Sequence, residues 1–150
     1  MAYAQLREVF HKIHRAHRDA ARCCAGLTDE SDSRLALLAE IFRKRERDFA
    51  RRLKAFEDSE HASLVETWIQ YVPFEGVEDA LTALQAESDR ASSTTLEKCL
   101  ELQQQLARFL RELAENRSAP QVEEFLQSLA DAEENAARAL GAAIVTENDI

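Results

Sequence analysis

Residues 6–27 read LREVFHKIHRAHRDAARCCAGL, and one stripe of inward-facing side chains follows this stretch from end to end. The members of the stripe recur at alternating steps of four and three residues, a spacing that keeps side chains on one face of an α-helix. They are Leu6, Phe10, Ile13, His17, Ala20, Cys24 and Leu27. The spacing predicts an amphipathic helix over residues 3–26, with a histidine among its inward positions.

Three further stretches carry the same helical pattern, and they cover residues 33–57, 95–116 and 120–144. Pro120 suits the first turn of the last of these helices, because the first helical N–H needs no partner within the helix. Their inward positions are Leu35, Leu38, Phe42, Phe49, Leu53 and Phe56, then Leu96, Cys99, Leu106, Leu110 and Leu113, then Val122, Phe125, Leu129, Leu140 and Ala143.

Turn-forming residues are scarce in this chain. Glycine and proline together number five among 150 residues, while 45% of the residues are hydrophobic and 31% are charged. A sheet protein needs turns at short, regular intervals, and these two residues are the usual turn formers. The composition therefore predicts an all-α protein, and it argues against an all-β fold and a glycine-rich phosphate loop. The length suits a single domain over residues 1–150.

The connections between the predicted helices differ in length. The first and last pairs are joined by short loops, whereas residues 58–93 form a long connection. A four-helix bundle needs a long crossover when two successive helices run parallel. We therefore predict a four-helix bundle made of two helical hairpins joined by a long crossover with short extra helices. Residues 77–93 either form a separate helix there or extend the helix at 95–116.

The two predicted hairpins also match each other in sequence. A shift of 86 residues places the inward positions of the first helix on those of the third, so that Ile13 falls on Cys99. A shift of 87 residues places the second helix on the fourth, so that Glu46 falls on Glu133. Near-equal shifts for two helices and their loop favour a duplicated helical hairpin.

The second hairpin carries a family resemblance. Residues 109–115 read FLRELAE, residues 120–125 read PQVEEF and residues 129–134 read LADAEE. Together with the order of hairpin, long crossover and hairpin, these segments resemble the ferritin-like superfamily, and its rubrerythrin-type branch in particular. The resemblance covers nearly the whole chain as a pattern and includes no diagnostic motif. It implies a ferritin-like four-helix bundle.

The resemblance also implies where two irons would be bound, and this chain departs from that pattern. The family takes a Glu-x-x-His pair from the second and fourth helices, and the two pairs would start at Glu46 and Glu133. Phe49 and Ala136 stand where the two histidines should be. The single glutamates of the first and third helices would fall at His17 and within 103–105, which read QQQ. A phenyl ring cannot coordinate iron, so we expect a metal-free, non-catalytic protein that acts through oligomerisation or protein contacts.

Two interpretations of the inward polar residues remain open. In the first, Arg45 lies near the inward stripe and neutralises one of the two buried glutamates. In the second, His17, Glu46 and Glu133 bind one iron or zinc ion in an atypical site, and the chain is a metal-dependent protein that handles redox chemistry or peroxide.

Charge and cysteine content restrict the partners and the compartment. A net charge of −9 argues against nucleic acid and anionic membranes as partners. No apolar run approaches the roughly 20 residues of a membrane span.

Three cysteines, two of them adjacent, and no signal-peptide pattern predict a reduced, cytoplasmic protein. We expect a homodimer or a protein partner, and the aromatic residues 68–74 either cover the side of the bundle or form the contact face.

Overall fold

The computed structural model describes residues 2–26, 33–60, 62–71, 74–86, 93–115 and 119–148, and most of them are helical. The prediction of an all-α protein is therefore confirmed. In chain order the elements are β1 (Ala2–Gln5), α1 (Leu6–Gly26), α2 (Ser33–Glu57), the 3₁₀-helix η1 (Ala62–Glu66), β2 (Trp68–Tyr71), α3 (Glu75–Ala86), α4 (Ser93–Ala114) and α5 (Pro120–Asn148). None of the described helices combines the length and the apolar character that a membrane crossing requires.

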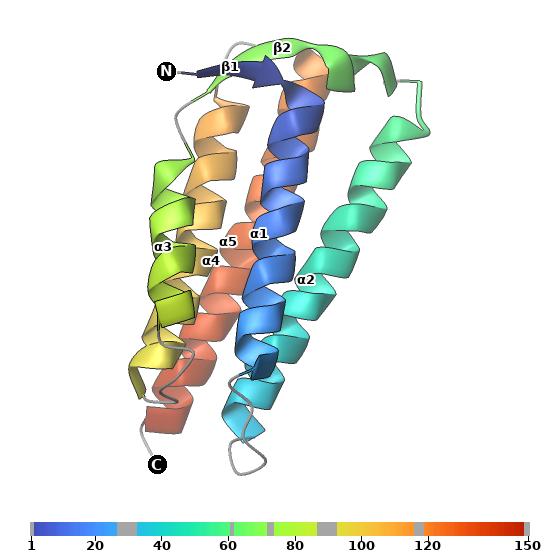
Figure 1. The fold of residues 1–150 in the computed structure, drawn as a ribbon. Coiled ribbons are helices and arrows are strands. Elements are labelled where there is room, and N and C mark those ends of the chain that lie inside the picture. The colour runs from blue at the N-terminus through green and yellow to red at the C-terminus, as the bar shows by residue number, and fades with distance from the viewer. Residues whose placement is uncertain are drawn as a thin grey trace.

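The long helices form two antiparallel hairpins. Helix α1 packs against α2, and α4 packs against α5. Figure 1 shows α1 leading away from the end that carries the strands and α2 returning to it. Helix α3 then runs back along α4, so that α2 and α4 point in the same direction (Figure 1). The long connection therefore returns the chain along the bundle, and α3 is a separate helix and not an extension of α4.

The N-terminal residues correct one prediction. Residues 3–5 were expected to begin the first helix, but they belong to β1, which pairs antiparallel with β2. The backbone N–H of Leu6 donates to the carbonyl of Thr67 at 2.9 Å, so the strand pairing continues to the first residue of α1. Helical periodicity alone did not reveal this, because the strand is only four residues long and its partner lies more than 60 residues away.

The other helix boundaries lie close to their predicted positions. Helix α2 covers the predicted range 33–57, whereas α4 begins and ends two residues before the predicted 95–116. Residue 116 lies outside the described residues. Helix α5 starts at Pro120 as predicted but continues four residues beyond 144. Gly141 does not end it, because a glycine within a helix costs only about 1 kcal/mol, and no described glycine has a positive φ angle.

The core lies between the helices and contains most of the predicted inward positions. Phe10 is fully buried, and its ring meets those of Phe49 and Phe125 edge to face at centroid distances of 6.3 and 5.6 Å. Also buried as predicted are Leu6, Ile13, Ala20, Phe42, Phe56, Cys99, Leu106, Leu110, Leu113, Val122, Leu129 and Leu140. Leu53 and Phe125 are half-buried at the edge of this core. The remaining predicted positions lie outside the residues whose side chains are described, and they are Cys24, Leu27, Leu35, Leu38, Leu96 and Ala143.

A matched pair of leucine truncations tests this core. Leu106 is 0% exposed and Leu37 is 58% exposed, and both lie within helices. We expect Leu106→Ala to lower the free energy of unfolding by about 2–5 kcal/mol, because a buried truncation loses apolar contacts and leaves a cavity. Leu37→Ala should change it by about 0.5 kcal/mol or less. Urea unfolding followed by circular dichroism measures both, and equal losses would contradict the described packing.

Candidate functional site

A buried carboxylate lies where the two hairpins meet. Glu133 of α5 is 0% exposed, and its Oε1 atom lies 2.9 Å from Nε2 of His17 and 3.2 Å from a terminal guanidinium nitrogen of Arg45. The side-chain amide of Gln103 donates to Oε2 of the same carboxylate and, at 3.5 Å, to the backbone carbonyl of Glu133. Each of the four long helices therefore contributes one residue to the cluster, which we call the Glu133 network.

The charge of Glu133 is maintained by its neighbours. Burial by itself raises the pKa of a carboxyl group, because it disfavours the charged form. Here the opposing effects of His17, Arg45 and Gln103 are larger, and they lower the pKa of Glu133 from the ordinary 4.5 to about 2. Glu133 is therefore an anion at neutral pH despite its burial.

Arg45 joins this network to the surface of α2. Its second terminal nitrogen lies 3.6 Å from Oδ2 of Asp48, one helical turn further along α2. The guanidinium thus lies between two carboxylates, one buried and one half-buried. This confirms the interpretation that Arg45 neutralises one of the two inward glutamates.

The second predicted glutamate lies apart from the first. Oε1 of Glu46 is 3.7 Å from Nε2 of His14, and both side chains are partly exposed. Partial burial lowers the pKa of His14 below 6.5, although Glu46 acts in the opposite direction, so the imidazole is neutral at pH 7. Sequence analysis missed this pair. The signal was present in the spacing, because His14 lies one helical turn from His17 and faces the same neighbouring helix.

The phenyl ring of Phe49 lies beside both histidines. Its centroid is 5.5 Å from that of His17 and 6.3 Å from that of His14, with the His14 ring stacked nearly parallel to it. Phe49 is 1% exposed. The residue at the position expected for a metal-binding histidine therefore makes aromatic contacts in the core.

Of the three candidate metal ligands, the structure brings together His17 and Glu133, whereas Glu46 pairs with His14. Within the described residues, no group of three or more His, Cys, Asp or Glu side chains is arranged to hold a metal ion. The guanidinium of Arg45 also contacts the carboxylate of Glu133, one of the two candidate carboxylate ligands. A cation at Glu133 would have to displace this positive charge, so the residues present do not fit a di-iron centre.

Some polar atoms of the Glu133 network lack a hydrogen-bond partner among the described residues. They are Nδ1 and Nε2 of His17, Nε of Arg45 and Oε1 of Gln103. Nε2 of His17 lies within ion-pair distance of Glu133 but without the alignment of a hydrogen bond. Each unsatisfied buried group costs about 1–3 kcal/mol. The attraction of His17 and Arg45 to the carboxylate must therefore offset an incomplete set of hydrogen bonds.

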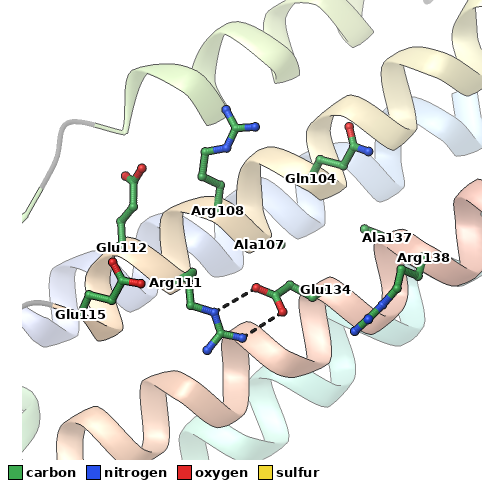
Figure 2. A pocket seen from close by; sticks show the side chains of 9 residues that line it. All are labelled: Gln104, Ala107, Arg108, Arg111, Glu112, Glu115, Glu134, Ala137 and Arg138. Atoms are coloured by element: carbon green, nitrogen blue, oxygen red, sulfur yellow. Dashed lines mark hydrogen bonds and ion pairs between the residues drawn. The ribbon is translucent and has the colours of Figure 1, made fainter.

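A separate hollow of about 510 Å³ lies between α4 and α5, and Arg111 and Glu134, which form an ion pair, are among the residues that line it (Figure 2). Arg111 donates to both carboxylate oxygens of Glu134 at 2.9 Å and to Asp131 at 2.5 Å. These contacts, the bonds to Glu134 first, raise the pKa of Arg111, and the same bonds lower the pKa of Glu134. The partners of Arg111 among the described residues all lie on α5. We therefore interpret the residues of this hollow as ion pairs that hold α4 and α5 together, and not as a ligand site.

Comparisons of the chain with models of protein families, with curated proteins and with solved structures find no match. The functional assignment therefore rests on the chemistry of the residues themselves.

The pH dependence of stability tests the electrostatics of Glu133. Its pKa in the folded protein, about 2, is lower than the ordinary 4.5. The charged form therefore stabilises the fold fully above about pH 4.5, and this contribution is lost as the pH falls towards 2. We expect Glu133→Gln to lower the free energy of unfolding at pH 7 by about 3 kcal/mol, because Arg45 loses its buried partner. The difference between the two proteins should shrink below about pH 4.5.

The neighbouring residue provides the control for this experiment. Glu134 is 37% exposed and pairs with Arg111 at the surface, so Glu134→Gln should cost about 1 kcal/mol or less. Urea unfolding at pH 7, 5, 4 and 3 gives the required free energies. A gap between the wild type and Glu133→Gln that stayed constant down to pH 3 would contradict a depressed pKa at Glu133.

Proposed function

We propose that this chain is a metal-free bundle protein of ferritin-like architecture that acts through protein–protein contacts, self-association included, and not through catalysis. The observation that carries the proposal is the ion pair between Arg45 and Glu133 at 3.2 Å. It places a permanent positive charge of the protein itself on the carboxylate that a metal-binding relative would need for its ion. The network is thereby neutralised without any bound cation.

The connectivity supports the architectural part of the proposal. Two antiparallel hairpins are joined by a connection that contains α3 and makes α2 and α4 parallel (Figure 1). A single long crossover between two hairpins is the arrangement found in ferritin-like bundles. Phe49 and Ala136 stand where the family has two histidine ligands, and neither side chain has an atom that can coordinate a metal. This accounts for a bundle of this architecture that holds no metal.

Strands β1 and β2 form a two-stranded ribbon, and its exposed face supports a role in protein contacts. Tyr3 is 68% exposed and Trp68 is 64% exposed. Tyr3 pairs with Gln70 and Gln5 with Trp68, and opposite residues of an antiparallel pair project to the same face, so both aromatic rings lie on the outer face. Ile69 and Phe74 of the same segment are buried. Among the described side chains of segment 68–74, Trp68 is therefore at the surface, whereas Ile69 and Phe74 belong to the core.

The ribbon also lacks the features that prevent association. Neither β1 (AYAQ) nor β2 (WIQY) contains a charged residue or a proline, and such residues are the usual protection of exposed strand edges. Exposed tyrosine and tryptophan are enriched in protein interfaces. A second copy of the chain, paired through this ribbon, is the partner we favour.

The alternative function is a metal-dependent redox or peroxide-handling protein with His17, Glu46 and Glu133 as iron or zinc ligands. One observation favours it, namely the 2.9 Å separation of His17 and Glu133. It also requires Glu46 to leave His14, from which it is 3.7 Å away, and Arg45 to leave Glu133.

Metal analysis distinguishes the two functions. After incubation with ferrous iron or zinc and removal of the free ion, we expect the purified protein to retain far less than one ion per chain. The reason is that binding would require the loss of the Arg45–Glu133 pair. Elemental analysis by mass spectrometry measures the content. Near-stoichiometric metal that is lost in His17→Ala would establish the alternative and overturn the proposal.

Sedimentation velocity at several protein concentrations tests the contact surface. We expect the wild type to self-associate and Trp68→Ser to weaken association at least about tenfold, because a large aromatic side chain is removed from the interface. Leu37→Ser is the control, since it removes another exposed hydrophobic side chain from a different part of the surface. A monomeric wild type, or equal weakening by both substitutions, would refute the assignment of the ribbon as the interface.

A further inference from the structure

A groove of about 460 Å³ lies between α2 and α5, on the outer side of Arg45, and the cluster and the ion pairs described above do not account for it. Helices α2 and α5 belong to different hairpins, and their backbones approach each other less closely than those of α1 and α2 or of α4 and α5. Helix α5 presents Ala132, Ala136 and Ala139 to this space. These side chains are too short to fill it, so the groove follows from the sequence of α5.

The lining of the groove changes along its length. Ile41 from α2 and Ala139 and Leu140 from α5 make it apolar near one end. Leu37, 58% exposed, lies one helical turn before Ile41 on the same face of α2. A ligand that covered this side chain would remove apolar surface from water.

The cationic residues of the lining are spread along α2. Lys44 and Arg45 lie within about 6 Å of Ile41 along the helix axis, whereas Arg52 marks the far end of the groove, and the acidic Asp48 lies between them. Arg45 is compensated by Glu133 and Asp48. Arg52 donates to the hydroxyl and the carbonyl of Ser128, both neutral, at 3.3 and 3.5 Å. Within the described part of the chain neither Lys44 nor Arg52 forms an ion pair, so one uncompensated positive charge lies at the far end of the groove and another lies along its wall, in a protein whose net charge is −9.

We propose that this groove binds an amphiphile with a single anionic headgroup and an unbranched aliphatic chain, a fatty carboxylate or an alkyl phosphate. The headgroup lies beside Arg52, and the chain lies along the alanines towards Ile41 and Leu140. The bond between Arg52 and Ser128 bridges the two helices at the polar end, so the chain extends in the opposite direction. This proposal does not depend on the proposed metal-free function, because it does not involve the contact between Arg45 and Glu133.

The dimensions favour a small molecule over a docked protein helix. From Ile41 to Arg52 the groove follows α2 for about 16 Å, at a rise of about 1.5 Å per residue. Its volume lies within the usual range for small ligands, about 300–1,000 Å³. A stable protein interface takes roughly 20–30 residues a side, many more than line this groove. An acidic helix of a partner is therefore the less suitable occupant.

Titration of the full chain with decanoate, followed by isothermal calorimetry below the concentration at which decanoate forms micelles, tests the proposal. We expect saturable binding, and weaker binding of octanoate by up to about fourfold for each methylene removed. Decanol should bind at least about tenfold more weakly than decanoate, because it lacks the charge. Octyl phosphate in place of octanoate shows which headgroup is preferred, and binding of either anion supports the proposal.

Variants on the exposed surface locate the binding without disturbing the core. Ala139→Phe fills the apolar end and should abolish binding, whereas Ala86→Phe adds the same side chain at an exposed position of α3 and should not. Arg52→Gln should weaken decanoate about tenfold, whereas Lys54→Gln, which removes a nearby charge outside the groove, should have little effect. Circular dichroism confirms that each variant is folded.

Three outcomes would overturn the proposal. They are the absence of saturable binding, equal affinity for decanol and decanoate, and binding that Ala139→Phe leaves unchanged. Should the anions fail to bind while a synthetic acidic amphipathic helix binds in a way that Ala139→Phe prevents, the groove is a peptide-docking surface and the proposal is wrong.

Discussion

The arrangement of the whole bundle depends on one buried negative charge. Glu133 is fully buried, and its compensation comes from His17 on α1, Arg45 on α2 and Gln103 on α4. An ionised carboxylate placed alone in an apolar interior costs many kcal/mol. The charge is therefore tolerated only when all four long helices are correctly placed around it. A displacement of one hairpin relative to the other by a helical turn would leave Glu133 without its partners and bury an uncompensated charge.

Such a network adds less to net stability than to the choice of one arrangement. The desolvation of two charges consumes much of their mutual attraction, and a buried ion pair can often be replaced by apolar residues without loss. The apolar contacts around Phe10 and Leu106 would form in several registers of similar helices, because leucine and phenylalanine pack without strict geometry. The pairing of Arg45 with Glu133 is specific to one register. We therefore infer that the apolar core provides the driving force and that the Glu133 network selects the native packing.

Periodicity and the positions of a few residues predicted much of this structure. The stripe through Phe10, Ile13 and His17 is buried as predicted, and the range of α2 was predicted to the residue. The strand pairing of Ala2–Gln5 with Trp68–Tyr71 could not be predicted, because it joins two four-residue segments from distant parts of the chain. At the site, spacing placed His17 and Glu133 on inward faces but could not give the direction of a long side chain. It therefore left open whether Arg45 or a metal would meet Glu133, and it missed the pair of His14 and Glu46.

The two halves of the predicted duplication differ in a way that connects the network with the groove. A shift of 87 residues places Glu46 on Glu133, and it also places Arg45 on Ala132. Only one of the two matched glutamates is buried: Glu133 has an arginine from the opposite hairpin, whereas Glu46 remains partly exposed beside His14. At the position that matches Arg45, the short side chain of Ala132 leaves space between α2 and α5. The same asymmetry therefore lets Arg45 reach across to Glu133 and leaves the space outside Arg45 unfilled, so the buried network and the open groove are two consequences of one difference between the hairpins.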